Sequence, residues 1–136
     1  MKRLFIWTCI VFCRVSVAWA EQPAISNIDE AKVYSQKVYN LYKAGNYKEY
    51  AAILPAGLLK FVSEKNYADT RAKIIKQLGN IGDIVFVTEL RLPGNMMVLL
   101  WKLEYDLGKG EKLDCLVQTA FSIKDGKWEM VGFRFL

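Results

Sequence analysis

The stretch that decides the fold is FSIKDGKWEMVGFRFL, Phe121–Leu136, in which two alternating segments flank a turn. Asp125-Gly126 in this context is among the strongest short signals for a β-hairpin, because both central residues of the tight turn need positive φ. The segments before and after the turn are therefore predicted to be neighbouring antiparallel strands. Trp128 follows the turn directly, and we expect it to seal the core.

Alternation of apolar and polar residues continues upstream of this hairpin as far as Asp83. It predicts four strands joined by short turns, at 84–92, 97–107, 113–124 and 127–136. The first strand is expected to carry one apolar face, made of Ile84, Phe86, Thr88, Leu90 and Leu92. The second strand has an apolar face that includes Met97, Leu99, Trp101 and Leu103, and an opposite face that becomes polar along its length. Such strands are half-buried in antiparallel sheets.

The part of the chain before the strands has helical periodicity. Helices are predicted at 28–44, 47–54 and 67–78, with a short helical turn at 58–62. Each of the three starts has an asparagine with an acid three residues later, which suits the open amides of a first turn: Asn27 with Glu30, Asn46 with Glu49, Asn66 with Asp69. The last helix is expected to bury Ala68, Ala72, Ile75 and Leu78. Helices followed by four antiparallel strands predict an α+β domain, with three N-terminal helices packed on a four-stranded antiparallel meander sheet.

Residues 1–20 are typical of a secretory signal peptide. Lys2 and Arg3 precede the apolar run Leu4–Cys13, and Ala18-Trp19-Ala20 places small residues where a signal peptidase reads them. An uncleaved anchor is the alternative, but ten uninterrupted apolar residues are fewer than the roughly 20 that cross a bilayer. We therefore expect a periplasmic or secreted domain, 21–136, without stable membrane insertion after cleavage.

The charge balance and the absence of certain residue types exclude several kinds of partner and catalytic site. Cleavage would leave Cys115 as the one cysteine and 16 basic against 14 acidic residues, a balance that gives no reason to expect nucleic acid as a partner. The sequence contains no histidine, which excludes Ser-His-Asp and Cys-His nucleophilic arrangements and the commonest metal ligand. It also lacks glycine-rich phosphate loops and paired-cysteine motifs. We expect neither a metal nor a cofactor.

Three N-terminal helices, the join LGNIGDI (Leu78–Ile84) and the closing strand DGKWEMVGF (Asp125–Phe133) resemble the nuclear-transport-factor-2-like superfamily. More narrowly, it resembles small secreted bacterial domains of unknown function in that superfamily. The resemblance spans about residues 29–135, and it implies a curved sheet that wraps the helices into a cone with a pocket at its open end. It transfers no catalytic residue, because the matching positions, Trp128, Gly132 and Phe133, are structural.

Candidate ligand-binding residues come from the tyrosine-rich helices and from the last strand. Tyrosines suit the pocket of an amphipathic ligand, although at this spacing they also suit the wall between helices and sheet. If Trp128 and Met130 point toward the helices, simple alternation places Arg134 near the mouth of the pocket, where it would suit a carboxylate or phosphate. The other phase buries Phe133 and leaves Arg134 in solvent, and the sequence leaves this choice open. The candidates are Arg134, Tyr105, Trp101 and Tyr42.

Three further features are candidates for function. Glu104 and Asp106 would suit a metal or an acid–base pair, but Lys102 beside them favours a solvated outer face. Thr88 interrupts an apolar row and either lines a cavity or is an ordinary strand residue. Apolar residues on the sheet face away from the core would form a homodimer if paired across a two-fold axis: Val98, Leu100, Leu116 and Ala120.

Together these patterns favour an exported, non-enzymatic binding or interaction domain. Its partner is expected to be a small amphipathic or anionic ligand, or a second copy of the chain. One alternative is a small pocket enzyme with isomerase- or hydratase-like proton transfer, which needs a carboxylate or a tyrosine in the pocket. Another is an accessory subunit of an envelope machine.

Overall fold

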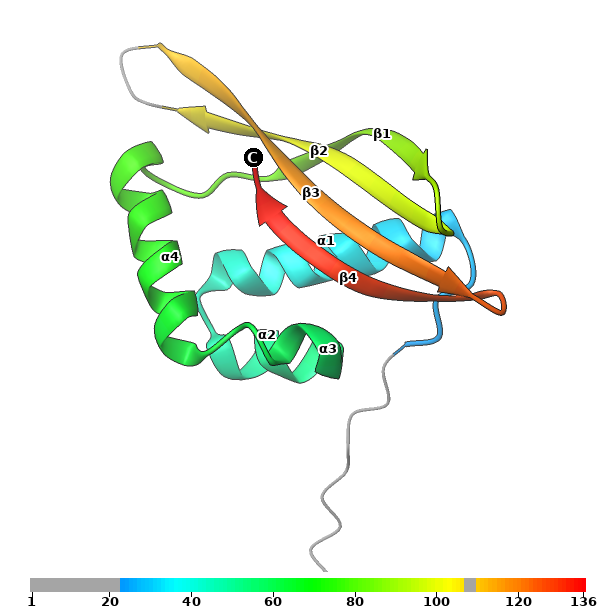
Figure 1. Cartoon of the computed structure of the whole chain (residues 1–136). Helices are drawn as coiled ribbons and strands as arrows, with labels where there is room; N and C mark the ends of the chain where they lie inside the picture. Colours follow the sequence, from blue (N-terminus) through cyan, green and yellow to red (C-terminus); the bar gives the residue numbers. More distant parts are fainter. Residues whose placement is uncertain (1–22, 107–109) are drawn as a thin grey trace, which may run out of the picture.

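The computed structural model describes residues 23–106 and 110–136, which form four helices and one four-stranded antiparallel sheet (Figure 1). The predicted signal peptide lies outside these residues. The strands lie in the sheet in the order of the chain, so the predicted α+β meander is confirmed. The helices are α1 (Ile28–Ala44), α2 (Tyr47–Ile53), α3 (Ala56–Leu59) and α4 (Glu64–Leu78), and the strands are β1 (Ile84–Leu92), β2 (Met96–Asp106), β3 (Lys112–Lys124) and β4 (Lys127–Phe135).

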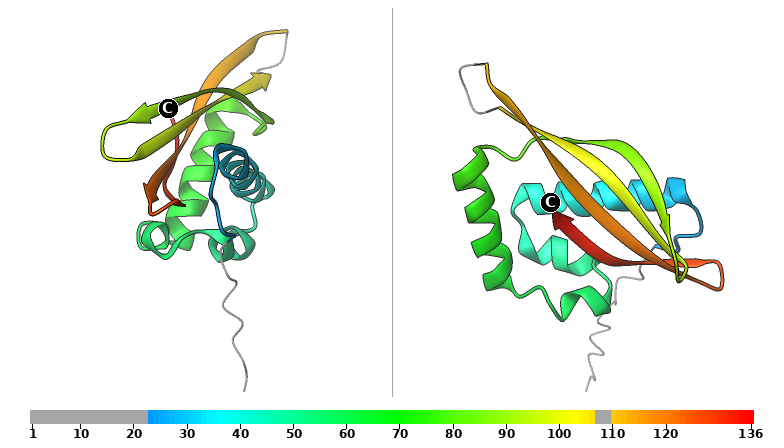
Figure 2. Two further views of the ribbon diagram at one scale, coloured as in Figure 1. Left: turned by 90° about the vertical axis from the view of Figure 1, so that its right-hand side faces the viewer. Right: turned by 45° about the horizontal axis from the view of Figure 1, so that its top comes forward.

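The helices lie on one side of a twisted sheet, and the other side is left uncovered (Figure 2). Helix α1 runs beneath the strands, while α2 and α3 lie below β4 and α4 stands at the end of the sheet (Figure 1). The predicted apolar face of the second strand is confirmed, since its side chains form the centre of the core. The core includes Ala31, Tyr34, Val38, Met97, Leu99, Trp101, Leu103, Val117 and Phe121.

Two of the three predicted helix caps are confirmed. The side-chain oxygens of Asn27 and Asn46 accept the amide hydrogen of the residue three positions on, at 3.0 and 3.3 Å. The third prediction is wrong, because Ser63 caps α4 and its Oγ accepts the amide hydrogen of Asn66 at 3.1 Å. Serine caps a helix as well as asparagine does, so α4 begins three residues earlier than Tyr67.

The buried face of α4 also differs from the prediction. Tyr67 and Ile74 are buried, whereas Ala68 and Ala72 are exposed and Ile75 is 36% exposed. A tyrosine ring removes much more apolar area from water than an alanine methyl does, so the helix turns its larger side chains toward α1 and α2. This rotation matters for the site, because it directs Tyr67 toward the other tyrosines.

A β-bulge at Val87 divides β1. Phe86 pairs with Trp101 of β2, and Thr88 pairs with Leu100, so Val87 has no partner. An extra residue moves all later side chains to the opposite face. The predicted single apolar face therefore holds only for Ile84 and Phe86. Thr88 is exposed on the outer face, so of its two possible roles the ordinary strand residue fits the structure.

A second bulge resolves the phase of β4. Ala120 of β3 pairs with Gly132, and the next residue, Phe121, pairs with Met130. Val131 between them is left without a partner. Met130 is buried before the bulge, and Phe133 and Phe135 pack against the core after it. Arg134 is consequently exposed, and its guanidinium lies beside Gln118 of β3. The sequence left two directions possible for the side chains of β4. The one that buries Met130 holds before the bulge, and the one that buries Phe133 and exposes Arg134 holds after it.

Candidate functional site

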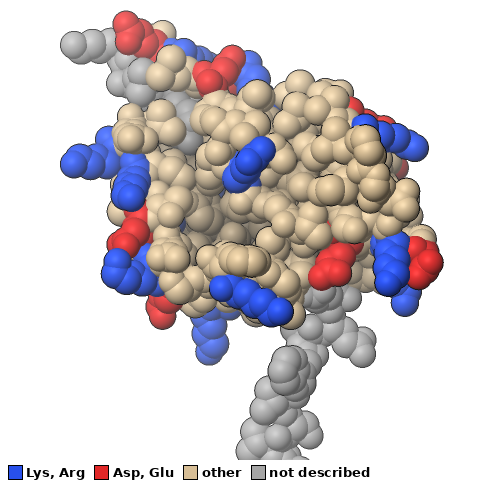
Figure 3. All heavy atoms as spheres, in the orientation of Figure 1, with Lys and Arg blue, Asp and Glu red and all other residues tan. Residues whose placement is uncertain are grey.

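A cavity of about 380 Å³ opens where α1, α2 and α4 meet the end of β4. In the orientation of Figure 1 the surface is hollowed between α4 and β4, and the atoms around the hollow are mostly uncharged (Figure 3). We call this the tyrosine cavity. Its aromatic lining consists of Tyr42, Tyr50, Phe61, Tyr67, Phe133 and Phe135.

Tyr42 is the centre of this aromatic cluster. Its ring centroid lies 5.3 Å from that of Tyr67, 5.7 Å from Tyr50, 5.6 Å from Phe133 and 5.4 Å from Phe135. The plane of the Tyr42 ring makes angles of 64°, 80° and 65° with the rings of Tyr50, Tyr67 and Phe133, so these rings meet edge to face. Aromatic quadrupoles favour this arrangement. The bulge at Val131 is what allows both phenylalanines to join the tyrosines from the sheet.

Three neighbouring tyrosines donate their hydroxyl hydrogens to backbone carbonyl oxygens. Tyr34 donates to the carbonyl oxygen of Ile53, and Tyr47 donates to that of Val62 at 2.9 Å. Tyr67 donates to the carbonyl oxygen of Tyr42 at 3.1 Å. These bonds hold the helices around the cavity.

The Tyr42 hydroxyl differs from these. The residue is 4% exposed, and its hydroxyl oxygen is buried without a hydrogen-bond partner among the described residues. Burial raises the pKa of Tyr42 to about 12, and burial likewise raises the pKa of Tyr50. Both phenols are therefore neutral near pH 7, and Tyr42 presents a desolvated hydrogen-bond donor. Leaving such a group without a partner costs roughly 1–3 kcal/mol.

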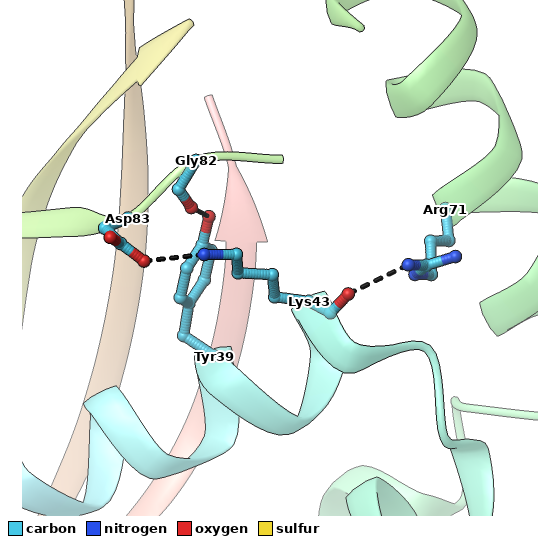
Figure 4. Close-up of polar contacts among 5 residues, drawn as sticks. All are labelled: Tyr39, Lys43, Arg71, Gly82 and Asp83. Carbon is cyan, nitrogen blue, oxygen red and sulfur yellow. Dashed lines mark hydrogen bonds and ion pairs between the residues drawn. The ribbon is translucent and has the colours of Figure 1, made fainter. Parts of the chain in front are cut away.

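The C-terminal end of α1 is fastened on two sides (Figure 4). On one side Arg71 of α4 donates from Nε to the carbonyl oxygen of Tyr42, at 3.3 Å, and from Nη2 to that of Lys43, at 2.8 Å. On the other side the Lys43 ammonium lies 2.6 Å from a carboxylate oxygen of Asp83, and the Tyr39 hydroxyl donates to the carbonyl oxygen of Gly82. The wall that carries Tyr42 is thereby held between α4 and the segment leading into β1.

The structure brings together two of the four predicted ligand-binding residues. Tyr42 and Arg134 line the same cavity. Trp101 does not join them, because it lies in a separate groove between α1 and β1, where its indole N–H donates to Thr119 Oγ1 at 3.1 Å. The side chain of Tyr105 lies outside the part of the chain that the structure describes.

Sequence reasoning missed five of the six aromatic lining residues as site residues. For Tyr50 and Tyr67 a signal existed, namely the crowding of tyrosines in the helical half. Phe133 and Phe135 carried no such signal, since their direction depends on the bulge at Val131. Phe61 follows α3 and is 78% exposed at the edge of the cavity, a position that no periodicity marks.

Acidic residues are absent from the described lining of the tyrosine cavity. Glu104 is exposed and pairs with Lys102 at 3.2 Å, and Lys102 also lies 3.1 Å from a carboxylate oxygen of Asp114. The side chain of Asp106 is not among those described. Within 23–106 and 110–136, no group of three or more His, Cys, Asp or Glu residues is placed to hold a metal ion.

The predicted dimer residues lie on the uncovered face of the sheet, with unequal exposure. Leu116 is 41% exposed and Leu100 is half-buried, whereas Val98 and Ala120 are buried without belonging to the core beneath the sheet. Other aliphatic side chains on this face or at its bulges are exposed: Val85, Val87, Leu90 and Val131. None of the described helices combines the length and the apolar character that crossing a membrane requires.

Comparisons with known proteins bear on the fold. No protein-family model matches the sequence, and no curated protein matches it. A designed protein of the nuclear-transport-factor-2-like type is similar in structure, with a TM-score of 0.50 and 13% identity over 79% of this chain and 97% of the design. The crystal structure of TerC co-crystallised with polyporic acid gives a TM-score of 0.44 and 12% identity, over 76% of this chain and 90% of TerC. With the observed order of helices and meander strands, the first similarity shows that this chain has the nuclear-transport-factor-2-like fold.

Proposed function

We propose that the protein is an exported, non-enzymatic binding domain that holds a small amphipathic molecule in the tyrosine cavity. The single observation that carries the proposal is the buried Tyr42 hydroxyl, which lacks a partner among the described residues within an aromatic wall. A ligand atom that accepts its hydrogen bond would remove the cost of burying that group. Aromatic walls with a few polar groups are the usual composition of small-molecule sites. The N-terminal signal pattern supports export.

The alternative of a proton-transfer enzyme receives less support from the same cavity. Isomerase- or hydratase-like chemistry needs a general base that is partly unprotonated near neutral pH. The described lining offers no carboxylate for this role. The pKa of Tyr42 is raised to about 12 by burial, so its phenol stays protonated and acts as a donor. A neutral donor in an aromatic wall suits binding better than proton abstraction.

Fluorescence titration with 8-anilinonaphthalene-1-sulfonate, an aromatic anion, tests the proposal. The Thr70→Trp substitution places a large ring in the cavity from α4, where Thr70 is exposed and part of the lining. Lys73→Trp is the matched control, because Lys73 is exposed on the same helix and is not part of that lining. We expect saturable binding by the wild-type protein and by Lys73→Trp, and loss of binding in Thr70→Trp. Equal binding by all three would refute the cavity as the ligand site.

We further propose that the protein forms a homodimer through the uncovered face of the sheet. The observation that favours this is the set of exposed aliphatic residues there, of which Leu90 and Leu116 are 44% and 41% exposed. Exposed apolar residues gathered on one face often belong to a protein interface. A two-fold axis through the face would cover the same residues in both copies.

A further inference from the structure

The tyrosine cavity has two chemically different ends. Its inner side is lined by Tyr42, whose hydroxyl is buried and has no partner among the described residues. Its outer end holds Arg134, which is exposed and also lines a second hollow of about 500 Å³. That hollow has walls from Leu58 and Val131, so Arg134 stands between the cavity and the outer surface of β4. A bound molecule would meet a neutral donor inside and a cation at the mouth.

Arg134 has the donors that an anion requires. Its Nε and Nη2 lie 3.3 and 3.1 Å from the side-chain oxygen of Gln118, and this contact orients the guanidinium plane. A guanidinium has five N–H donors, so the donors of Nη1 and one of Nη2 are left for a ligand. Two parallel bonds to a carboxylate match this geometry. Because the described lining contains no Asp or Glu, Arg134 meets no competing carboxylate within the cavity.

The walls between the two ends favour a flat aromatic body. Tyr50 and Tyr67 on one side and Phe133 and Phe135 on the other present ring edges and faces to the cavity. Aromatic ligands gain from offset or edge-to-face contacts with such rings, in addition to the burial of apolar area. An ammonium ligand would also find ring faces, but the positive charge of Arg134 at the mouth would repel it.

We infer that the tyrosine cavity takes an aromatic acid, a planar ligand with a hydrogen-bond acceptor facing Tyr42 at the inner end and a carboxylate facing Arg134 at the mouth. This inference rests on the proposed binding function and adds the class of ligand. It assigns the two anchoring roles to the two ends, and each role can be removed separately.

Three fluorescent naphthalene probes separate the two anchors. 6-Hydroxy-2-naphthoate has both polar groups, 2-naphthoate has the carboxylate alone, and 2-naphthol has the hydroxyl alone. We expect 6-hydroxy-2-naphthoate to bind most tightly. Tyr42→Phe is expected to weaken the two hydroxylated probes by about fivefold and to leave 2-naphthoate nearly unchanged, since a neutral hydrogen bond is worth roughly 1 kcal/mol. Arg134→Gln is expected to weaken both naphthoates by about tenfold or more and to leave 2-naphthol nearly unchanged. Circular dichroism confirms that each variant is folded.

The outcomes distinguish this inference from the proposed function. If either substitution weakens all three probes equally, or if no probe binds while 8-anilinonaphthalene-1-sulfonate still does, the aromatic-acid inference is overturned. Binding of that dye with continued blocking by Thr70→Trp would then leave the cavity as a site for another class of ligand. If Thr70→Trp weakens the binding of neither the naphthalene probes nor the dye, the cavity is excluded as the ligand site. The proposed function is then refuted together with the aromatic-acid inference.

Discussion

Arg71 of α4 donates a hydrogen bond from Nε to the carbonyl oxygen of Tyr42 at the end of α1, 3.3 Å away. The Tyr67 hydroxyl donates to the same oxygen at 3.1 Å. The carbonyl oxygen of Tyr42 therefore accepts from two side chains as well as from the Gly45 amide at 3.2 Å, while its side-chain hydroxyl has no partner among the described residues. Because both donors come from α4, the helix that forms one wall of the tyrosine cavity is fixed to the residue that gives the cavity its polar end.

These two donors predict a coupled loss of stability. Tyr67→Phe should lower the free energy of unfolding by about 1 kcal/mol, because the Tyr42 oxygen keeps Arg71 and the Gly45 amide as donors. Arg71→Ala should lower it more, because Arg71 also donates to the carbonyl oxygen of Lys43. The double variant should lose at least the sum, since the buried carbonyl then keeps only the Gly45 amide, at 3.2 Å, as a donor. Urea unfolding of the four proteins measures this coupling. Additivity within about 0.3–0.5 kcal/mol would show that the two bonds are independent.

Gly45 makes room for the same guanidinium. Its φ is +78°, and a Cβ added there would lie 2.8 Å from Arg71 Cζ. Gly94 is a matched control, because its φ is +79° and nothing lies within 4 Å of an added Cβ. Alanine in the left-handed region costs about 1–2 kcal/mol at either position, and Gly45→Ala should cost about 1 kcal/mol more by displacing Arg71. In an Arg71→Ala background, thermal unfolding should show equal losses for the two glycine substitutions.

Sequence periodicity was sufficient for the meander, for α1 and for the buried face of β2, because each follows an uninterrupted repeat. Periodicity gives the wrong side-chain direction when it is continued past either β-bulge, because the extra residue shifts the alternation by one position. Val87 and Val131 lie in bulges, and no residue type distinguishes them from ordinary strand valines. The direction of Arg134 therefore could not be decided from the sequence. In α4, spacing alone favoured an alanine face, whereas the contact area of Tyr67 determined which side is buried.

The bulge at Val131 is predicted to be essential for the site. Deleting Val131 would restore simple alternation and turn Phe133 and Phe135 outward, with Arg134 directed inward. We expect a loss of about 3 kcal/mol or more, since two aromatic side chains leave the core. Val131→Thr is the control, because it keeps the residue count at a position that is 42% exposed and should change stability by less than about 1 kcal/mol. Equal stability of the deletion variant and the wild type would contradict the role of the bulge.

The Tyr42 hydroxyl should affect stability and binding in opposite directions. Tyr42→Phe removes a buried group without a described partner, so at pH 7 the variant should be as stable as the wild type, or up to about 1 kcal/mol more stable. The same variant should bind the hydroxylated naphthalene probes more weakly. A large loss of stability at pH 7, measured by urea unfolding, would mean that the hydroxyl has a structural partner.

The raised pKa of Tyr42 adds a dependence on alkaline pH. In the unfolded chain a tyrosine loses its proton near pH 10. In the folded protein burial raises the pKa of Tyr42 to about 12. Between these values the folded state binds more protons, so the stabilising effect is complete below pH 10 and is lost as the pH rises toward 12. Unfolding free energy should therefore decline less steeply above pH 10 in Tyr42→Phe than in the wild type. Parallel declines would show that Tyr42 ionises equally in both states.

The uncovered face of the sheet gives a prediction about assembly. Leu116 is exposed there and pairs in the sheet with Lys102, whose ammonium is already shared by Glu104 and Asp114. Leu116→Asp would add a third carboxylate to this group and a buried charge to a two-fold interface, so it should weaken dimerisation at least tenfold. Val33→Asp is the control, because Val33 is 71% exposed on α1, the helix that runs beneath the sheet on the side opposite the uncovered face (Figure 1 and Figure 2). Sedimentation equilibrium at high micromolar concentration should show dimers for the wild type and Val33→Asp and monomers for Leu116→Asp. A wild-type monomer unaffected by either substitution would exclude the sheet face as a dimer interface.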